Sequence, residues 1–115
     1  MIQSINPSNG KLIKEYQSYS NEKVLSVIEQ VSDEYSTWKE TLFKERSKVL
    51  NDIANALSNN IEEHARMISL EIGKPIVESR MEVEKCVWVL QYFADNIDHA
   101  ERAMKDWLRY LEENG

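Results

Sequence analysis

The chain has 115 residues, 42% of them hydrophobic, and 14 lysines and arginines against 20 aspartates and glutamates leave a net charge of −6. This length and composition predict one globular domain over residues 1–115, and an acidic chain without basic clusters excludes a nucleic-acid-binding module. No apolar run approaches the roughly 18 residues of a membrane span, and neither a basic amphipathic face nor a secretory signal is present, so we expect a cytoplasmic protein without a membrane partner.

Residues 1–17 predict a short β-hairpin. Apolar residues flank the segment Asn6-Pro7-Ser8-Asn9-Gly10 on both sides. Proline presets one backbone dihedral for a turn, and Asn-Gly tolerates positive φ. Because an isolated two-stranded hairpin is marginal in water, we expect it to pack on another element.

Three helices are predicted next, at residues 20–40, 43–59 and 61–72. Ser20 is the expected N-cap of the first helix. The third helix is expected to begin with a capping box between Asn60 and Glu63, and to end at Gly73. The first helix carries one apolar stripe at four- and three-residue spacing, formed by Val24, Ile28, Val31, Tyr35 and Trp38.

A long final helix is predicted over residues 75–113. No glycine or proline interrupts it, and at 1.5 Å per residue it would span about 57 Å. Its outer face is expected to carry ion pairs four residues apart, such as Arg80 with Glu84 and Arg109 with Glu113. The predicted fold class is therefore mostly α, with a short N-terminal β-hairpin and about four helices. The apolar stripe of the last helix contains Val83, Val87, Leu90, Ala94, Ile97, Met104, Leu108 and Leu111.

Several segments, in this order, resemble the N-terminal helical region of the NAD(P)-dependent aldehyde dehydrogenase family, most closely its succinate-semialdehyde type. The residues that carry the resemblance are Ile5-Asn6-Pro7-Ser8-Asn9-Gly10-Lys11, Trp38 before Phe43-Lys44-Glu45-Arg46, Leu70-Glu71-Ile72-Gly73-Lys74-Pro75, and Glu78, Glu82, Val83 and Tyr92. The resemblance covers about residues 1–102. Residues 103–115 match no family pattern and stay helical, which suggests an engineered or chimeric chain.

The resemblance implies oxidation of an aldehyde through a cysteine, with hydride transfer to NAD(P). This chemistry needs an activated thiolate, a general base, oxyanion donors and a dinucleotide site, and in the family all of them lie downstream of the region present here. The chain has three glycines, too few for a Gly-x-Gly-x-x-Gly phosphate turn. We therefore predict no catalytic, cofactor-binding or metal-binding residues, no bound cofactor, and no enzymatic activity for the isolated chain.

The residues that could still carry chemistry each have a plainer interpretation. Cys86 is the sole cysteine, and its apolar helical neighbours predict a buried, inert thiol. His64 and His99 lie 35 positions apart without a zinc-binding pattern, so surface roles are expected. Lys74 lies in a tight connection between helices, where a cation is stabilised by the partial negative charge at the C-terminus of the preceding helix, so a structural role is expected.

Two groups of side chains are also more typical of structure than of a site. The carboxylates Glu78, Glu82 and Glu84 indicate a solvated helix face. Trp38, Trp88 and Trp107 occur at helical spacings that favour core or interface packing.

Two functional hypotheses follow from these observations. In the first, the chain is a catalytically inactive fragment that acts as a helical structural or assembly module. In the second, it is part of a working NAD(P)-dependent aldehyde dehydrogenase and is completed by another polypeptide. We also expect self-association, because the last helix lacks the neighbours that the family's nucleotide-binding sheet would supply, which leaves its apolar stripe exposed.

Overall fold

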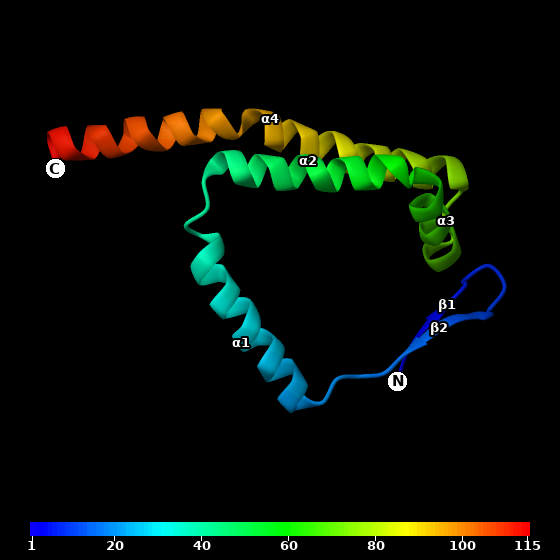
Figure 1. The fold of residues 1–115 in the computed structure, drawn as a ribbon. Helices are drawn as coiled ribbons and strands as arrows, with labels where there is room; N and C mark the ends of the chain where they lie inside the picture. Colours follow the sequence, from blue (N-terminus) through cyan, green and yellow to red (C-terminus); the bar gives the residue numbers. More distant parts are fainter.

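The computed structural model describes residues 1–115, which form a two-stranded hairpin followed by four helices (Figure 1). Strands β1 (Ile2–Ile5) and β2 (Leu12–Tyr16) precede α1 (Asn21–Trp38), α2 (Phe43–Asn59), α3 (Ile61–Ile72) and α4 (Ile76–Asn114). This confirms the predicted fold class. Each helix boundary lies within two residues of its prediction, because caps and chain breakers mark the helix ends.

The hairpin turn uses the two asparagines that the sequence places in it. The strands are antiparallel, with Ile2 opposite Tyr16 and an irregularity after Ser4. The Asn6 carboxamide oxygen accepts a hydrogen bond from the Ser8 N–H at 2.8 Å. Gly10 has a φ of +70°, which a side chain would disfavour.

The helix starts are capped differently from one another. The Ser20 hydroxyl accepts the Lys23 N–H at 3.3 Å, as predicted. The capping box predicted for α3 is wrong. The Asn60 side chain makes no N-cap bond and instead donates to the Ala56 carbonyl at 2.9 Å, so it satisfies the end of α2 rather than the start of α3.

The packed part of the molecule is a layer made by α2, α3 and the first half of α4. Helices α2 and α4 lie side by side along the length of α2, and α3 packs on the beginning of α4 (Figure 1). Small side chains at the contacts allow the helices to approach closely, and the Ser47 hydroxyl donates to the Ala94 carbonyl at 2.8 Å. The buried residues are Ala54, Ala65, Ser79, Val83 and Ala94.

The other elements extend away from this layer. Helix α1 stands off at an angle to α2 and has no buried residue, and the last turns of α4 project beyond the beginning of α2 (Figure 1). The radius of gyration is 20.1 Å, whereas a compact domain of this length has roughly 13 Å. The chain therefore buries far less of itself than its length and composition would allow.

Candidate functional site

Cys86 is exposed, so the predicted burial of this residue is wrong. Val83, one turn earlier on α4, points into the layer and is buried, whereas Cys86 lies at the flank of the same helix. Helical periodicity placed both residues near the apolar stripe, but the partner helices cover only part of it. A lone exposed thiol is a labelling site, and it needs a base or a cation beside it to become a nucleophile.

An open apolar groove runs along the junction of α2, α3 and α4, and Cys86 lines it. His64 on α3 lines the same groove, whereas His99 does not. A second apolar hollow adjoins this groove through Leu57 and Cys86. No group of three potential metal ligands occurs in the molecule. The full lining of the groove is Leu57, His64, Met67, Ile68, Glu71, Ile72, Glu82, Val83 and Cys86.

Lys74, in the short connection between α3 and α4, forms an ion pair with Glu82 on α4. The hydrogen bond to Glu82 raises the pKa of the Lys74 ammonium group. Among the three carboxylates Glu78, Glu82 and Glu84, Glu82 thus has a partner in the connection that precedes α4. This contact ties the connection to the first turns of α4, whereas the sequence had predicted that Lys74 favours the C-terminus of α3.

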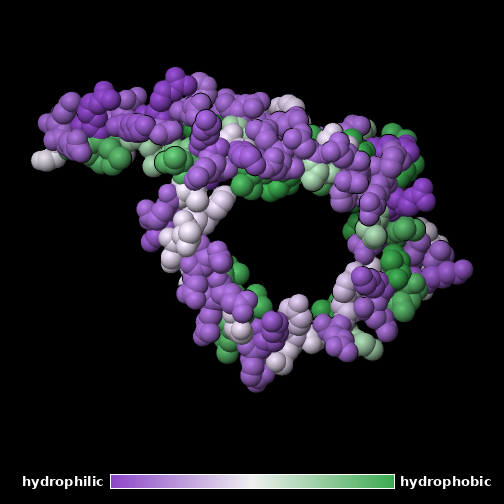
Figure 2. Space-filling model, in the orientation of Figure 1, coloured by the Kyte–Doolittle hydropathy of each residue, from purple (hydrophilic) through white to green (hydrophobic).

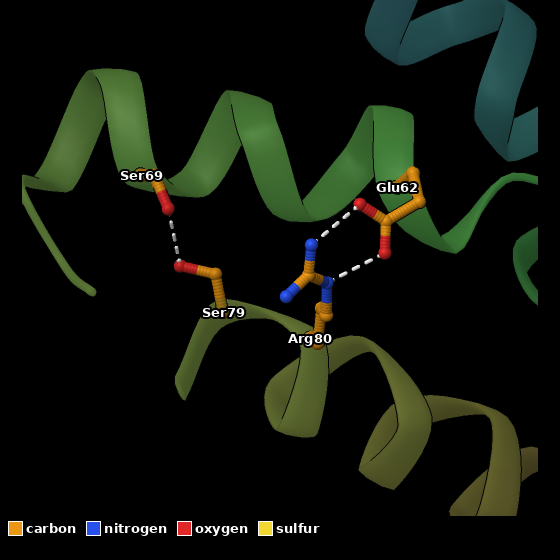
Figure 3. A network of polar contacts seen from close by, with 4 residues as sticks. All are labelled: Glu62, Ser69, Ser79 and Arg80. Atoms are coloured by element: carbon orange, nitrogen blue, oxygen red, sulfur yellow. Dashed lines mark hydrogen bonds and ion pairs between the residues drawn. The ribbon is translucent and has the colours of Figure 1, made fainter. Parts of the chain in front are cut away.

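A polar contact between α3 and α4, which the sequence pattern did not indicate, is shown in Figure 3. The Arg80 guanidinium donates to both carboxylate oxygens of Glu62, at 2.6 and 2.9 Å. These hydrogen bonds lower the pKa of the Glu62 carboxyl and raise that of the Arg80 guanidinium. The predicted pair of Arg80 with Glu84 is therefore wrong, because α3 brings a bidentate partner closer than the next turn of α4 does.

Beside this ion pair, the Ser69 and Ser79 hydroxyls lie 2.9 Å apart and share a hydrogen bond (Figure 3). Ser79 is fully buried, and a buried hydroxyl needs such a partner. The polar contacts of this region therefore position α3 on α4. They have no reacting centre between them.

The hairpin docks on the C-terminal end of α3. The Ser4 hydroxyl donates to a Glu71 carboxylate oxygen at 2.7 Å. Gly73 has a φ of +80°, and a Cβ atom placed on it would lie 3.0 Å from Pro7 Cγ. The segments Asn6–Gly10 and Leu70–Pro75, which are far apart in the sequence, therefore meet in space at Pro7 and Gly73, which the sequence alone could not show.

Many large apolar side chains of the helices are uncovered. Figure 2 shows apolar atoms on the sides of α1 and of the helical layer that face the central opening. Along the predicted stripe of α1, Ile28 is 58% and Val31 is 63% exposed. Near the end of α4, Met104, Trp107 and Leu108 are each more than half exposed. None of the helices is both long and apolar enough to cross a bilayer.

Comparison with known proteins identifies a family and several relatives that this chain resembles. A model of the aldehyde dehydrogenase family matches residues 1–110 of the chain. A succinate-semialdehyde dehydrogenase [NADP(+)] of Mycobacterium bovis is 27% identical over 97 residues, which are 84% of this chain and 21% of the relative. The succinate semialdehyde dehydrogenase [NAD(P)+] Sad of Escherichia coli is 31% identical over 93 residues, which are 81% of this chain and 20% of the relative.

Two solved structures have the same arrangement of elements. The glyceraldehyde-3-phosphate dehydrogenase of Methanocaldococcus jannaschii, solved with NADP, superposes with a TM-score of 0.79 at 26% identity, over 84% of this chain and 21% of that protein. The succinic semialdehyde dehydrogenase of Streptococcus pyogenes has the same TM-score at 24% identity, over 84% of this chain and 22% of that protein. The chain thus spans about a fifth of the length of the proteins it matches.

Proposed function

The chain belongs to the aldehyde dehydrogenase family, and from this premise we propose that it is a helical structural module without dehydrogenase activity of its own. The observation that carries the proposal is the amount of uncovered surface: 5 of 115 residues are buried. A chain whose amphipathic helices leave their apolar sides open is suited to packing against another polypeptide surface.

The family match extends to residue 110, whereas the sequence resemblance was predicted to end at about residue 102. The proposal therefore needs no chimeric origin for the C-terminal segment.

The chemistry of the groove supports the inactive part of the proposal. Aldehyde oxidation through a cysteine needs a base close to the thiol, oxyanion donors and a bound nicotinamide. Cys86 and His64 line one groove. The glycines that could form a phosphate-binding turn lie elsewhere: Gly10 is in the hairpin turn, and Gly73 is at the α3–α4 corner. Neither position offers the glycine-rich strand-to-helix turn that binds a dinucleotide.

An activity assay tests this part of the proposal. The purified chain is mixed with succinate semialdehyde and NAD⁺ or NADP⁺, and the absorbance of the reduced nicotinamide is followed against a buffer control. We expect no turnover. Turnover that disappears in Cys86→Ala would assign Cys86 as a nucleophile, and turnover that persists in Cys86→Ala would reveal another site; either result overturns the proposal.

The assembly part of the proposal concerns the projecting end of α4, which we propose as the surface through which the chain self-associates. Beyond the reach of α2, this end exposes Met104, Trp107, Leu108 and Leu111. Apolar residues at three- and four-residue spacing are what a helix–helix seam requires, and closed two-fold symmetry is the commonest result.

Light scattering of the purified chain tests self-association. We expect twice the 13.5 kDa mass of one chain. Leu108→Asp should return the mass to that of a monomer, and Lys11→Ala, on the exposed hairpin, should leave the dimer intact. A monomer at micromolar concentration before any substitution would contradict the assembly role without affecting the expectation of inactivity.

A further inference from the structure

Residues 39–42 form a short elbow between α1 and α2, and one side chain reaches across it. Arg46, in the first turn of α2, donates to the backbone carbonyl oxygen of Lys39 at 2.7 Å and to that of Trp38 at 3.3 Å. Its Nε donates to the Thr41 hydroxyl oxygen at 3.1 Å. The guanidinium therefore contacts the end of α1, the elbow and α2 at once.

Aromatic rings and a second hydrogen bond complete this arrangement. The guanidinium carbon lies 5.8 Å from the centroid of the Trp38 ring and 5.4 Å from that of Phe43, within the range of cation–π contacts. The Thr41 hydroxyl itself donates to the Trp38 carbonyl at 2.7 Å. Arg46 is half-buried, whereas the neighbouring Lys44 is exposed.

The contacts match the chemistry of arginine in particular. The last carbonyl groups of a helix have no partner within the helix and carry partial negative charge, so a cation placed there is favoured. A planar guanidinium offers several donors in one rigid fork, while a lysine ammonium offers a single charged point on a flexible stem. The fork bonds two successive carbonyls and a hydroxyl while the guanidinium carbon lies near two aromatic rings.

Without such a device, α1 would be expected to lie against the helical layer. The apolar sides of α1 and of the layer face the same opening, yet they do not meet (Figure 2). Apolar burial is non-directional and favours any approach that removes such surfaces from water. The hydrogen bonds of Arg46 across the elbow would oppose this closure.

We infer that Arg46 is the positioning residue that holds α1 away from the α2–α4 layer, so that α1 stays an open arm with its apolar face accessible. This inference does not depend on self-association or on the absence of enzymatic activity. It predicts that loss of the guanidinium lets α1 swing toward the layer, which closes the opening and hides the α1 stripe.

Distance measurement by double electron–electron resonance tests the inference. Spin labels are attached at Glu29→Cys on α1 and Glu84→Cys on α4, in a Cys86→Ala background and diluted with unlabelled chain to suppress distances between copies. With Arg46 present we expect one narrow distance distribution. With Arg46→Ala we expect a shift to shorter distances and a broader distribution, while far-UV circular dichroism shows that the helices persist.

Matched variants distinguish an effect of the guanidinium geometry on the distance distribution from an effect of its charge and from an effect of misfolding. Arg46→Lys keeps the charge without the fork and should also shift the distribution. Thr41→Val removes one partner of the fork and should broaden the distribution less, so it still decides the question if Arg46→Ala fails to fold. Lys44→Ala removes a cation from the same helical turn and should change nothing. An unchanged distribution in Arg46→Ala or Arg46→Lys, or an equal shift in Lys44→Ala, would overturn the inference.

Discussion

Helices α1 and α2 are nearly equal in length, 18 and 17 residues, and both carry an apolar stripe, yet they have different surroundings. In α2, Ala54 is fully buried between neighbouring helices. In α1, no residue is buried. Amphipathicity thus indicates that a helix has a partner, but it does not indicate whether that partner is part of the same chain.

The largest expected effect comes from placing one charge in each of these two helices. Ala54→Asp puts a carboxylate into a site with no accessible surface, and the unpaired buried charge should cost more than about 4 kcal/mol of unfolding free energy. Val31→Asp on the exposed stripe of α1 should change the unfolding free energy by no more than about 0.5 kcal/mol. Urea unfolding followed by circular dichroism measures both changes.

Equal effects of the two substitutions would break the comparison. If Val31→Asp were as damaging as Ala54→Asp, α1 would be packed in solution, either on the layer or on a second copy. Light scattering of the Val31→Asp protein would then distinguish these cases, because only packing between copies would change the mass.

The hairpin is intermediate between the two helices, since it contacts the end of α3 through a hydrogen bond of Ser4 and through Pro7 and Ser8 beside Gly73. Gly73→Ala should lower the unfolding free energy by about 1–2 kcal/mol because alanine is disfavoured at positive φ. The loss should be larger still because the new Cβ would lie 3.0 Å from Pro7 Cγ. Gly10→Ala has the same backbone penalty but open space around it, so its cost should be smaller. Thermal or urea unfolding compares the two variants.

A double substitution isolates the packing contribution at this contact. In a Pro7→Ala background, the cost of Gly73→Ala should fall to about that of Gly10→Ala, because the ring that meets the new Cβ is gone. Costs for Gly73→Ala that are the same in both backgrounds would show that the hairpin does not rest on the α3–α4 corner.

The smallest expected effect concerns the ion pair of Glu62 with Arg80 at the exposed edge of the layer. The folded-state pKa of Glu62 lies below its value in the unfolded chain, so its stabilising contribution is fully present above the ordinary glutamate pKa of about 4.3 and is lost as the pH falls through the folded value. The melting temperature should therefore exceed that of Glu62→Gln by a constant amount near neutral pH, and the difference should vanish in acid.

Glu63→Gln is the matched control for this measurement, because Glu63 is the next residue on α3 and takes no part in the ion pair. Its melting temperature should follow that of the unsubstituted chain near neutral pH. A difference between the unsubstituted chain and Glu62→Gln that grows on acidification would contradict the assigned direction of the pKa shift.

Most of the secondary structure was determined by local sequence. Ser20 caps α1, Gly73 ends α3 in the left-handed conformation, and the absence of glycine and proline after Pro75 lets α4 continue to Asn114. These predictions succeeded because each depends on the backbone preferences of a few adjacent residues. The family could also be predicted from the sequence, since the resemblance depends on short segments and on their order along the chain.

The tertiary structure alone decided which apolar faces are covered and which polar groups meet. Periodicity placed Cys86 close to a buried stripe, but the width of the contact between α4 and its partners leaves it exposed. Arg80 could have paired along its own helix, yet α3 presents Glu62 to its Nε and to one of its terminal nitrogens. Pro7 meets Gly73, and Arg46 spans the elbow of α1 and α2, because side chains recognise neighbours in space that a sequence pattern does not specify.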